Sequence, residues 1–383
     1  MLYFYIFDQI LRMNLKKIAR LAHRWLGLTS GLVVFIVSVT GCLYTFQDEI
    51  RDATEPWRKI EVQNKAVLLP SKLSAIAKKV HPELQVGRIV YVSKNRAAVI
   101  FLTGKGQFYT VHINPYSGVV LHDQNLRKDF FTIVQFIHIY LLLPGPIGKM
   151  VVGVSVFIFL GMLITGVFIW WPKRKTQVKR SLTIKFNGKW RRINYDLHSV
   201  LGIYTCLIAF VLAFTGLSIS YDWLKTGVKN TINLGNTYAL EEKIPEVRLT
   251  KPLDPDKLLD VTFLESVKRS PHSDMFLIAP LVKGSAVLNI TVYEKALFYY
   301  KSDRYYFNAN TGAIVKELAH RDKSNGLKLN EMSYDLHTGQ ILGTTGKIIA
   351  FMSSFICASL PLTGFLFWRG KRKDKRKARI TQA

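Results

Sequence analysis

Four long apolar runs stand out along the chain, each bordered by polar and basic residues. They contain almost no charge and lie at Trp25–Phe46, Met150–Trp171, Val200–Ser220 and Ile348–Trp368. At about 1.5 Å per residue, a helix of roughly 20 residues crosses a hydrocarbon core of ~30 Å. The pattern therefore predicts an α-helical membrane protein with four transmembrane helices.

The two long segments between these runs have the patterns of small mixed domains. Leu73–Val80 has helical spacing, and Gly87–Val92 and Ala97–Thr103 alternate like strands. Residues 111–120 and 305–314 both have a strand, an Asn- and Gly-containing turn and a second strand. We expect one helix and a few antiparallel strands in each segment. The pattern does not assign the opening of the second, roughly Lys225–Arg248.

The net charge of +27 is concentrated in three short segments. Residues 1–24, 172–192 and 369–383 together hold 22 basic and 2 acidic residues, whereas 47–130 and 221–336 are nearly balanced. The positive-inside rule then places both termini and the middle loop in the cytoplasm, and both long segments outside. This distribution excludes a soluble enzyme, a disordered protein and a disulfide-rich secreted domain. We expect the lipid bilayer as partner and no nucleic acid.

The spans also indicate an internal duplication. A shift of 175 residues carries His23 onto His198 and Thr40-Gly41 onto Thr215-Gly216, and a shift of 198 carries Thr165-Gly166 onto Thr363-Gly364. We therefore expect two parallel span–domain–span repeats, related by an axis along the membrane normal. Because small residues let helices approach closely, we interpret the four Thr–Gly dipeptides as helix packing.

These patterns divide the chain into eight parts. They are the N-terminus with the first span (1–46), the first outward domain (47–130), a His138 segment with the second span (131–171), a basic loop (172–192), the third span (193–221), the second outward domain (222–333), a His337 segment with the fourth span (334–368) and a basic tail (369–383). Met13 is an alternative start for the chain.

The three cysteines, Cys42, Cys206 and Cys357, all lie inside the apolar runs and form no CxxC motif, so we expect them to pack as small apolar residues. Val39–Cys42 resembles a lipoprotein cleavage site. The same Thr–Gly dipeptide recurs in the other three runs without a cysteine, which favours an uncleaved span.

Four of the nine histidines flank the spans. His23 and His198 lie at the cytoplasmic ends of spans one and three, and His138 and His337 lie outside spans two and four. Ionisable residues at membrane depth are functional candidates. The other five are expected to be surface or turn residues: His81, His112, His122, His272 and His320.

The duplication should bring equivalent histidines face to face, one pair near each membrane surface. Two facing imidazoles in an apolar bundle suit a bis-histidine haem b. A non-haem metal relay and a proton path remain alternatives. Arg24, Lys149 and Lys347 are candidates to bind haem propionates, and small neighbours for the macrocycle are Gly27, Gly31 and Gly202. Tyr195 and Tyr334, three residues before a histidine, are candidate supporting groups on the same helix face.

Two motifs resemble one known family. Asn114-Pro115-Tyr116-Ser117-Gly118-Val119-Val120-Leu121 is similar to the end of a PepSY domain, and His23-Arg24-Trp25-Leu26-Gly27-Leu28 with Thr40-Gly41 resembles the PepSY-associated transmembrane family. The resemblance covers about residues 14–372. It implies two PepSY-like outward domains, a bacterial inner membrane location and an iron-regulated membrane protein or ferric-siderophore reductase. It also favours two haems.

We therefore expect an inner-membrane oxidoreductase that carries electrons from the cytoplasm to ferric siderophore in the periplasm. The electron donor must be a separate reductase, a cytosolic carrier or quinol, because the chain has no GxGxxG after a strand and no Walker motif. Two alternatives remain: a membrane-anchored binding or regulatory protein without redox activity, and an iron or siderophore permease. A hydrolase is disfavoured because GxSxG and HExxH are absent.

Overall fold

Four long helices carry the predicted apolar runs. They are α1 (Leu2–Thr45), α5 (Gly145–Trp170), α8 (Gly202–Ser220) and α12 (Gly343–Thr381). The computed structural model describes residues 2–236, 241, 243–244, 246–281 and 284–381. The stretches long and apolar enough to cross a membrane are Leu15–Thr45, Gly145–Trp170, Trp190–Ser220 and Gln340–Gly370. The prediction of four membrane-spanning helices is confirmed, with spans of 31, 26, 31 and 31 residues that are longer than the predicted apolar runs.

The chain divides into a helical unit and a sheet unit. The helical unit contains Phe46 and the residues before it, Val134–Ser220, and Leu336 onward; the sheet unit contains Gln47–Ile133 and Tyr221–Asp335. Each is described by itself below.

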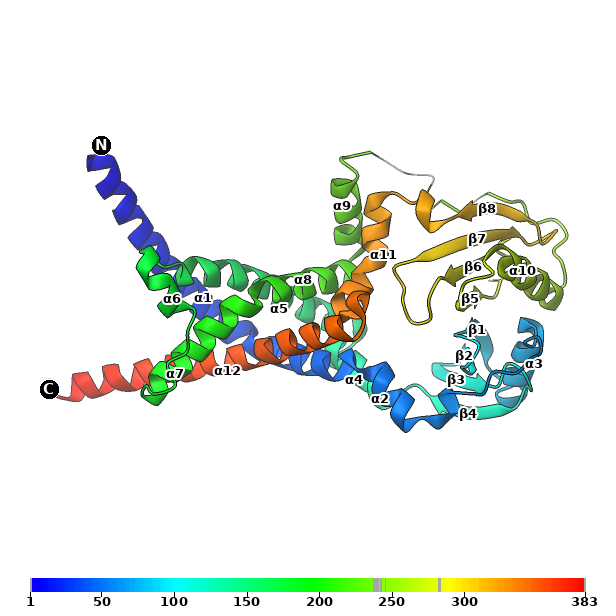
Figure 1. Ribbon diagram of the computed structural model, residues 1–383, viewed down its shortest axis with the longest axis horizontal. Coiled ribbons are helices and arrows are strands. Elements are labelled where there is room, and N and C mark those ends of the chain that lie inside the picture. Colours follow the sequence, from blue (N-terminus) through cyan, green and yellow to red (C-terminus); the bar gives the residue numbers. More distant parts are fainter. Residues whose placement is uncertain (1, 237–240, 242, 245, 282–283, 382–383) are drawn as a thin grey trace. The chain divides into compact units, whose positions relative to one another are not determined.

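In the helical unit, α1 and α8 each pack against both α5 and α12 (Figure 1). The bundle centre is apolar, with a core of Val34, Phe159, Leu163, Ala209 and Cys357 contributed by all four helices. The three cysteines are free thiols within these helices, as expected. This packing provides the apolar interior that four uncharged runs require.

The third span changes its winding at a histidine. It begins as α7 (Trp190–Asp196), continues as a π-helical turn (Leu197–Leu201) that contains His198, and then becomes α8. A π-helical turn widens the helix locally and is frequent at functional sites. The sequence pattern did not predict this turn.

The sheet unit is built around one antiparallel sheet of eight strands in the order β4-β3-β2-β1-β5-β6-β7-β8 (Figure 1). The strands are β1 (Gln85–Tyr91), β2 (Ala98–Gly104), β3 (Gln107–Ile113), β4 (Val120–Asn125), β5 (Met275–Ala279), β6 (Val287–Tyr293), β7 (Ser302–Asn308) and β8 (Ile314–Leu318). The two outward segments thus contribute four consecutive strands each. They join where β1 pairs with β5, Val90 opposite Leu277.

One helix from each segment packs onto this sheet. Helix α3 (Pro70–Val80) precedes β1, and α10 (Pro255–Arg269) precedes β5. Both contribute fully buried leucines, Leu73 and Leu258, to a core shared with the strands. The predicted helix, the strands and the two strand–turn–strand motifs are confirmed. The joining of both segments into one sheet was not predicted.

The predicted surface position of His112 is wrong. His112 lies on β3 and is buried on the sheet face opposite its neighbours Val111 and Ile113, which belong to the hydrophobic core, and it pairs with His122 on β4. Among the other four, His81, His122 and His320 are half-buried and His272 is exposed. Trp57 stacks on His122 with ring centroids 3.9 Å apart.

Short elements connect the sheet to the spans. In the first half they are α2 (Gln47–Thr54), the 3₁₀ turn Pro56–Arg58 and α4 (Phe130–Tyr140); in the second they are α9 (Asp222–Ile232), the 3₁₀ turns His320–Asp322 and Gln340–Leu342, and α11 (Asn325–Thr338). The basic loop holds the 3₁₀ turn Lys175–Gln177 and α6 (Val178–Ser181). Helix α9 falls within the opening that the sequence pattern did not assign; residues 237–240, 242 and 245 of that opening lie outside the described residues.

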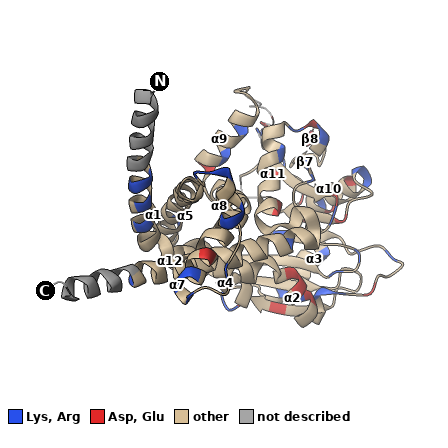
Figure 2. Cartoon of the chain, turned by 60° about the vertical axis from the view of Figure 1, so that its left-hand side comes forward, with Lys and Arg blue, Asp and Glu red and all other residues tan. Residues whose placement is uncertain are grey.

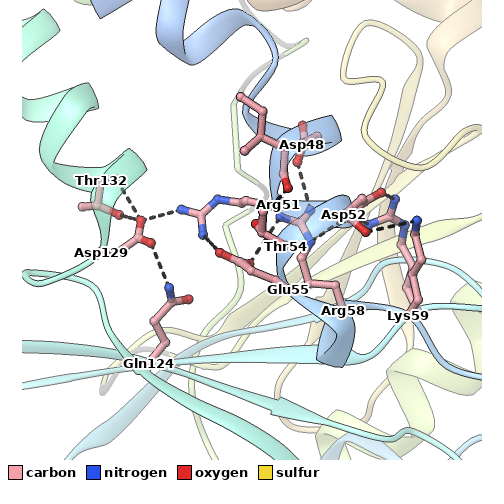
Figure 3. Close-up of polar contacts among 12 residues, drawn as sticks. Asp48, Arg51, Asp52, Thr54, Glu55, Arg58, Lys59, Gln124, Asp129 and Thr132 are labelled. Carbon is pink, nitrogen blue, oxygen red and sulfur yellow. Dashed lines mark hydrogen bonds and ion pairs between the residues drawn. The ribbon is translucent and has the colours of Figure 1, made fainter.

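An ion-pair cluster orders the start of α4, the helix that carries His138 (Figure 3). Asp129 bonds the backbone N–H and hydroxyl of Thr132 at 2.8 and 2.7 Å, which caps the helix. Arg51 of α2 pairs with the same carboxylate and with Glu55. The segments that enter and leave the first outward domain are therefore joined by a buried charge pair.

The charges follow the two units. Lys and Arg appear in blue on the described start of α1 and around α7, whereas Asp and Glu gather on α2 (Figure 2). The basic segments thus lie before the first span, between the second and third spans and after the fourth, and not at the span ends that continue into the outward segments.

Candidate functional site

The helical unit brings the four span-flanking histidines together in two pairs. The basic-side pair is His23 on α1 and His198 on the π-helical turn, with ring centroids 6.3 Å apart and planes at 88°. The domain-side pair is His138 on α4 and His337 on α11, at 6.0 Å and 65°. Each pair combines a histidine from one half of the chain with one from the other. All four side chains are half-buried.

Every one of these imidazoles has a threonine at its Nδ1 atom. The Nδ1–Oγ1 distances are 3.0 Å for His23–Thr165, 3.0 Å for His198–Thr363, 3.1 Å for His138–Thr40 and 3.3 Å for His337–Thr215. These four threonines are the first residues of the four Thr–Gly dipeptides.

The threonine hydroxyls fix which nitrogen carries the proton. Thr40 donates its hydroxyl hydrogen to carbonyls of its own helix, Ile36 at 2.8 Å and Val37 at 3.0 Å, and the other three threonines do the same. A hydroxyl whose hydrogen is used in this way acts as an acceptor toward the imidazole. Each Nδ1 is therefore an N–H donor, and each Nε2 keeps its lone pair.

Two backbone carbonyls support the same assignment. Nδ1 of His198 lies 3.1 Å from the carbonyl oxygen of Leu360, and Nδ1 of His337 lies 2.8 Å from that of Leu212. Because a carbonyl only accepts hydrogen bonds, both Nδ1 atoms must donate. A metal-ligating histidine commonly donates its other ring N–H in this manner.

The glycines of the dipeptides lie directly against the same rings. A Cβ atom placed on each would lie 3.3 Å from Cε1 of His138 for Gly41, 3.4 Å from His23 for Gly166, 2.8 Å from His337 for Gly216 and 3.3 Å from His198 for Gly364. The interpretation of these dipeptides as helix packing alone was incomplete. Their glycines also admit an imidazole.

The two pairs lie at different depths of an apolar bundle. On α1, Thr40, which bonds His138, follows His23 by 17 residues, and on the third span Thr215 follows His198 by the same number. At 1.5 Å per helical residue this separates the pairs by about 25 Å along the bundle. The apolar core around Phe159 and Leu163 occupies the bundle centre. One small cofactor could not contact both pairs.

The sequence that builds these two histidine pairs matches a known family. A model of the PepSY-associated TM region covers residues 20–371, nearly the whole chain. The chain belongs to this family. A search of curated proteins gave no match. Together with the four apolar helices, the family match identifies a multi-pass membrane protein whose natural surroundings are a lipid bilayer.

In this PepSY-associated protein, the donor set at each pair is two imidazoles. Among the residues that the structure describes, no three His, Cys, Asp or Glu side chains are grouped so that they could hold a metal ion. A site with three or four protein ligands, as non-haem metals prefer, is therefore missing from the described part of the chain. Two imidazoles alone suit a metal that is bound in a prosthetic group, because that group supplies the remaining ligands.

Ring distance alone does not define such a site. His112 and His122 in the sheet unit also have centroids 6.2 Å apart, simply because they face each other on neighbouring strands. Nδ1 of His112 has no hydrogen-bond partner, and the Trp57 indole covers His122. The span-flanking pairs differ because a threonine holds every Nδ1 atom.

The predicted auxiliary residues lie at the expected span ends. Arg24 is exposed and lies over the Trp25 ring. Lys149 is half-buried in the first turns of α5, and Lys347 is buried in the first turns of α12. The glycines expected to border a macrocycle face side chains of neighbouring helices: Gly27 faces Met162, Gly31 faces Pro361 and Gly202 faces Leu360.

The tetrapeptide Tyr-Asp-Leu-His occurs twice, ending at His198 and at His337. In both copies the aspartate is buried. Tyr195 is exposed and packs against Phe367, and Tyr334 packs on Tyr299. Asp196 bonds Arg192 Nε at 2.8 Å and the Lys185 N–H at 3.3 Å.

Asp335, the matching residue in the second copy, accepts the N–H groups of Tyr299 and Tyr300 at 2.8 Å each. Each aspartate thus holds backbone of a loop beside the helix that carries a histidine. The repetition of the tetrapeptide was the sequence signal that could have identified the aspartates. The sequence analysis selected the tyrosines instead, because a residue three positions before the histidine lies on the same helix face.

Proposed function

We propose that this membrane protein carries electrons from one side of the bilayer to the other through two b-type haems, one bound by each histidine pair. The observation that supports this most is the shared state of the four imidazoles. Each donates Nδ1–H to a helix, each keeps an Nε2 lone pair, and they meet two by two at opposite depths.

The residues present fit the group. Two imidazoles that each bound one shared metal through a ring nitrogen, at about 2 Å and with a ring radius of about 1.2 Å, would have centroids up to roughly 6.4 Å apart. The pairs lie at 6.3 and 6.0 Å.

Haem b, when bound, would supply a one-electron Fe(III)/Fe(II) couple. His23 and His198 would hold one group and His138 and His337 the other. The apolar core between them would exclude water and charge from the bundle centre. Arg24 on the basic side, and Lys149 and Lys347 at the other span ends, would provide the cations nearest to carboxylate substituents.

Orientation and substrate follow from the charge pattern and the family. The basic segments would lie in the cytoplasm of a bacterium and the sheet unit in the periplasm. Ferric siderophore is the proposed substrate: one electron converts bound Fe(III) to Fe(II), whose lower charge weakens its hard oxygen ligation. The electron would come from a separate cytosolic reductase, a carrier or membrane quinol.

The apolar bundle centre disfavours the permease alternative. Transporters place substrate sites near the midplane at interrupted helices. The hydrophobic cluster of the bundle consists of apolar side chains and a thiol, and the buried hydroxyls of Thr205 and Ser353 beside it bond each other at 2.7 Å. The π-helical turn lies at the basic end of the third span. A polar substrate would therefore meet mainly apolar side chains along this path.

A visible spectrum of the purified full-length protein tests the proposal. We expect reduced b-type bands and two haems per chain. His23→Ala or His198→Ala should each remove one haem, and His138→Ala or His337→Ala the other, while the exposed His272→Ala should retain both. A haem-free preparation from a haem-sufficient host would refute the proposal, as would equal haem content in all five variants. Oxidation of the reduced protein by ferric siderophore then tests the substrate.

A further inference from the structure

We propose that the four Thr–Gly dipeptides are positioning elements for the imidazoles: each threonine sets the tautomer and donor strength of one histidine, and each glycine sets how closely its ring approaches the span. The inference rests on the proposed haem sites. It assigns a role to residues that do not touch the cofactor.

The arrangement is the same at all four places. Thr40-Gly41 serves His138, Thr165-Gly166 serves His23, Thr215-Gly216 serves His337 and Thr363-Gly364 serves His198. In every case the hydroxyl meets Nδ1 and the glycine meets Cε1 of the same ring. Helix packing alone would not place four different glycines against the same ring atom of four different histidines.

The contacts are reciprocal within each half of the chain. The first span carries His23 and the dipeptide for His138, and the second span carries the dipeptide for His23. The third and fourth spans repeat this with His198 and His337. Each half of the chain thus contains the dipeptides that contact its own two histidines.

The hydroxyl has a chemical consequence as well as a geometric one. An acceptor at Nδ1–H increases the electron donation of Nε2 to a bound metal. Stronger donation stabilises Fe(III) more than Fe(II), because Fe(III) has the greater charge. Replacement of the hydroxyl by a methyl group should therefore raise the midpoint potential of that haem alone.

Threonine variants at the basic-side pair provide the test. The double variant Thr165→Val/Thr363→Val keeps the side-chain volume and removes both hydroxyls, while Thr165→Ser/Thr363→Ser retains them. Thr29→Val is the matched control, because the Thr29 hydroxyl donates to the carbonyl oxygens of Trp25 and Leu26 in its own helix. Full-length protein is titrated spectroelectrochemically, and haem per chain is measured alongside.

We expect the valine double variant to favour the reduced form of one haem by threefold to tenfold, which is about 28–59 mV for a one-electron couple. The carbonyl of Leu360 remains as a second acceptor for His198, which limits the change. The serine variant and Thr29→Val should titrate like the parent. Loss of that haem in the valine variant but not in the serine variant would also support positioning.

The inference is overturned if the valine variant titrates like the parent, or if the serine variant or Thr29→Val shifts as much as it does. These outcomes differ from failure of the proposed function, which would appear as absence of haem from the parent protein itself.

Discussion

The closest approach between a dipeptide and a histidine gives the sharpest prediction. A Cβ atom on Gly216 would lie 2.8 Å from Cε1, 3.3 Å from Nδ1 and 3.6 Å from Nε2 of His337. Carbon atoms in contact normally lie about 3.5–4.0 Å apart, so Gly216→Ala forces the ring to move by roughly 1 Å. The ring is held by Leu212 and Thr215 and cannot move without weakening those bonds.

The expected magnitude combines two effects. Overpacking of a well-filled site costs about 1–3 kcal/mol, and one weakened hydrogen bond adds about 0.5–1.5 kcal/mol. A total of about 1.5–4.5 kcal/mol corresponds to a roughly 10- to 1600-fold loss of haem affinity at the domain-side pair, at 1.4 kcal/mol per factor of ten. The basic-side haem should remain.

Haem content and the reduced spectrum provide the assay. The matched control is Gly161→Ala on α5, where an added Cβ meets no atom within 4 Å, and Gly166→Ala on the same helix, at 3.4 Å from His23, should have a mild effect. If Gly216→Ala retains two haems with unchanged bands, or if Gly161→Ala loses as much, the glycines do not act through the rings.

Three further predictions concern the sheet unit, each measured by thermal unfolding of the full-length protein in detergent. Burial raises the pKa of Asp335 from its usual 3.8 to about 6, so ionisation of this side chain opposes folding as the pH rises through that range. The stability of Asp335→Asn relative to the parent should therefore increase progressively between pH 4 and 6. An equal difference at all pH values would contradict this. Burial, with repulsion from neighbouring cations, lowers the pKa of His112 from 6.5 to about 4. The folded protein therefore loses stability as the pH falls from 6.5 toward 4, because the unfolded chain takes up a proton that the folded state resists. The unfolding temperature of His112→Phe should depend less on pH in this range. Arg51→Ala leaves Asp129 without its guanidinium partner and should destabilise the protein by about 3–5 kcal/mol, whereas the exposed Arg321→Ala should change little; similar melting temperatures for both would show that the buried pair contributes nothing.

Much of this architecture is encoded locally and could be predicted. Spans are visible because some 20 uncharged apolar residues have no alternative but lipid or a buried core. The strand–turn–strand motifs around Asn114 and Asn308 are visible because Asn and Gly support the turn, and Gly118 and Gly312 both adopt positive φ. The histidines were found because duplication predicts which ones should meet.

The remaining features depend on tertiary contacts. The pairing of β1 with β5 joins residues nearly 190 positions apart, and nothing in either strand's alternation specifies that partner. His112 was predicted to be a surface or turn residue because the outward histidines have no ligand-like spacing, whereas it lies buried on β3 (Gln107–Ile113). The second role of the Thr–Gly dipeptides required knowledge of which helices are neighbours.

The division of each histidine pair between the two halves of the chain has a consequence for biogenesis. His23 is synthesised long before His198, and His138 long before His337, so neither proposed haem site exists in the nascent protein until the third or fourth span has been inserted. Haem insertion would therefore be a late maturation step, with the basic-side site completed first. Chains truncated before residue 337 are expected to bind at most one haem. Under haem starvation, the full-length protein without haem should be degraded.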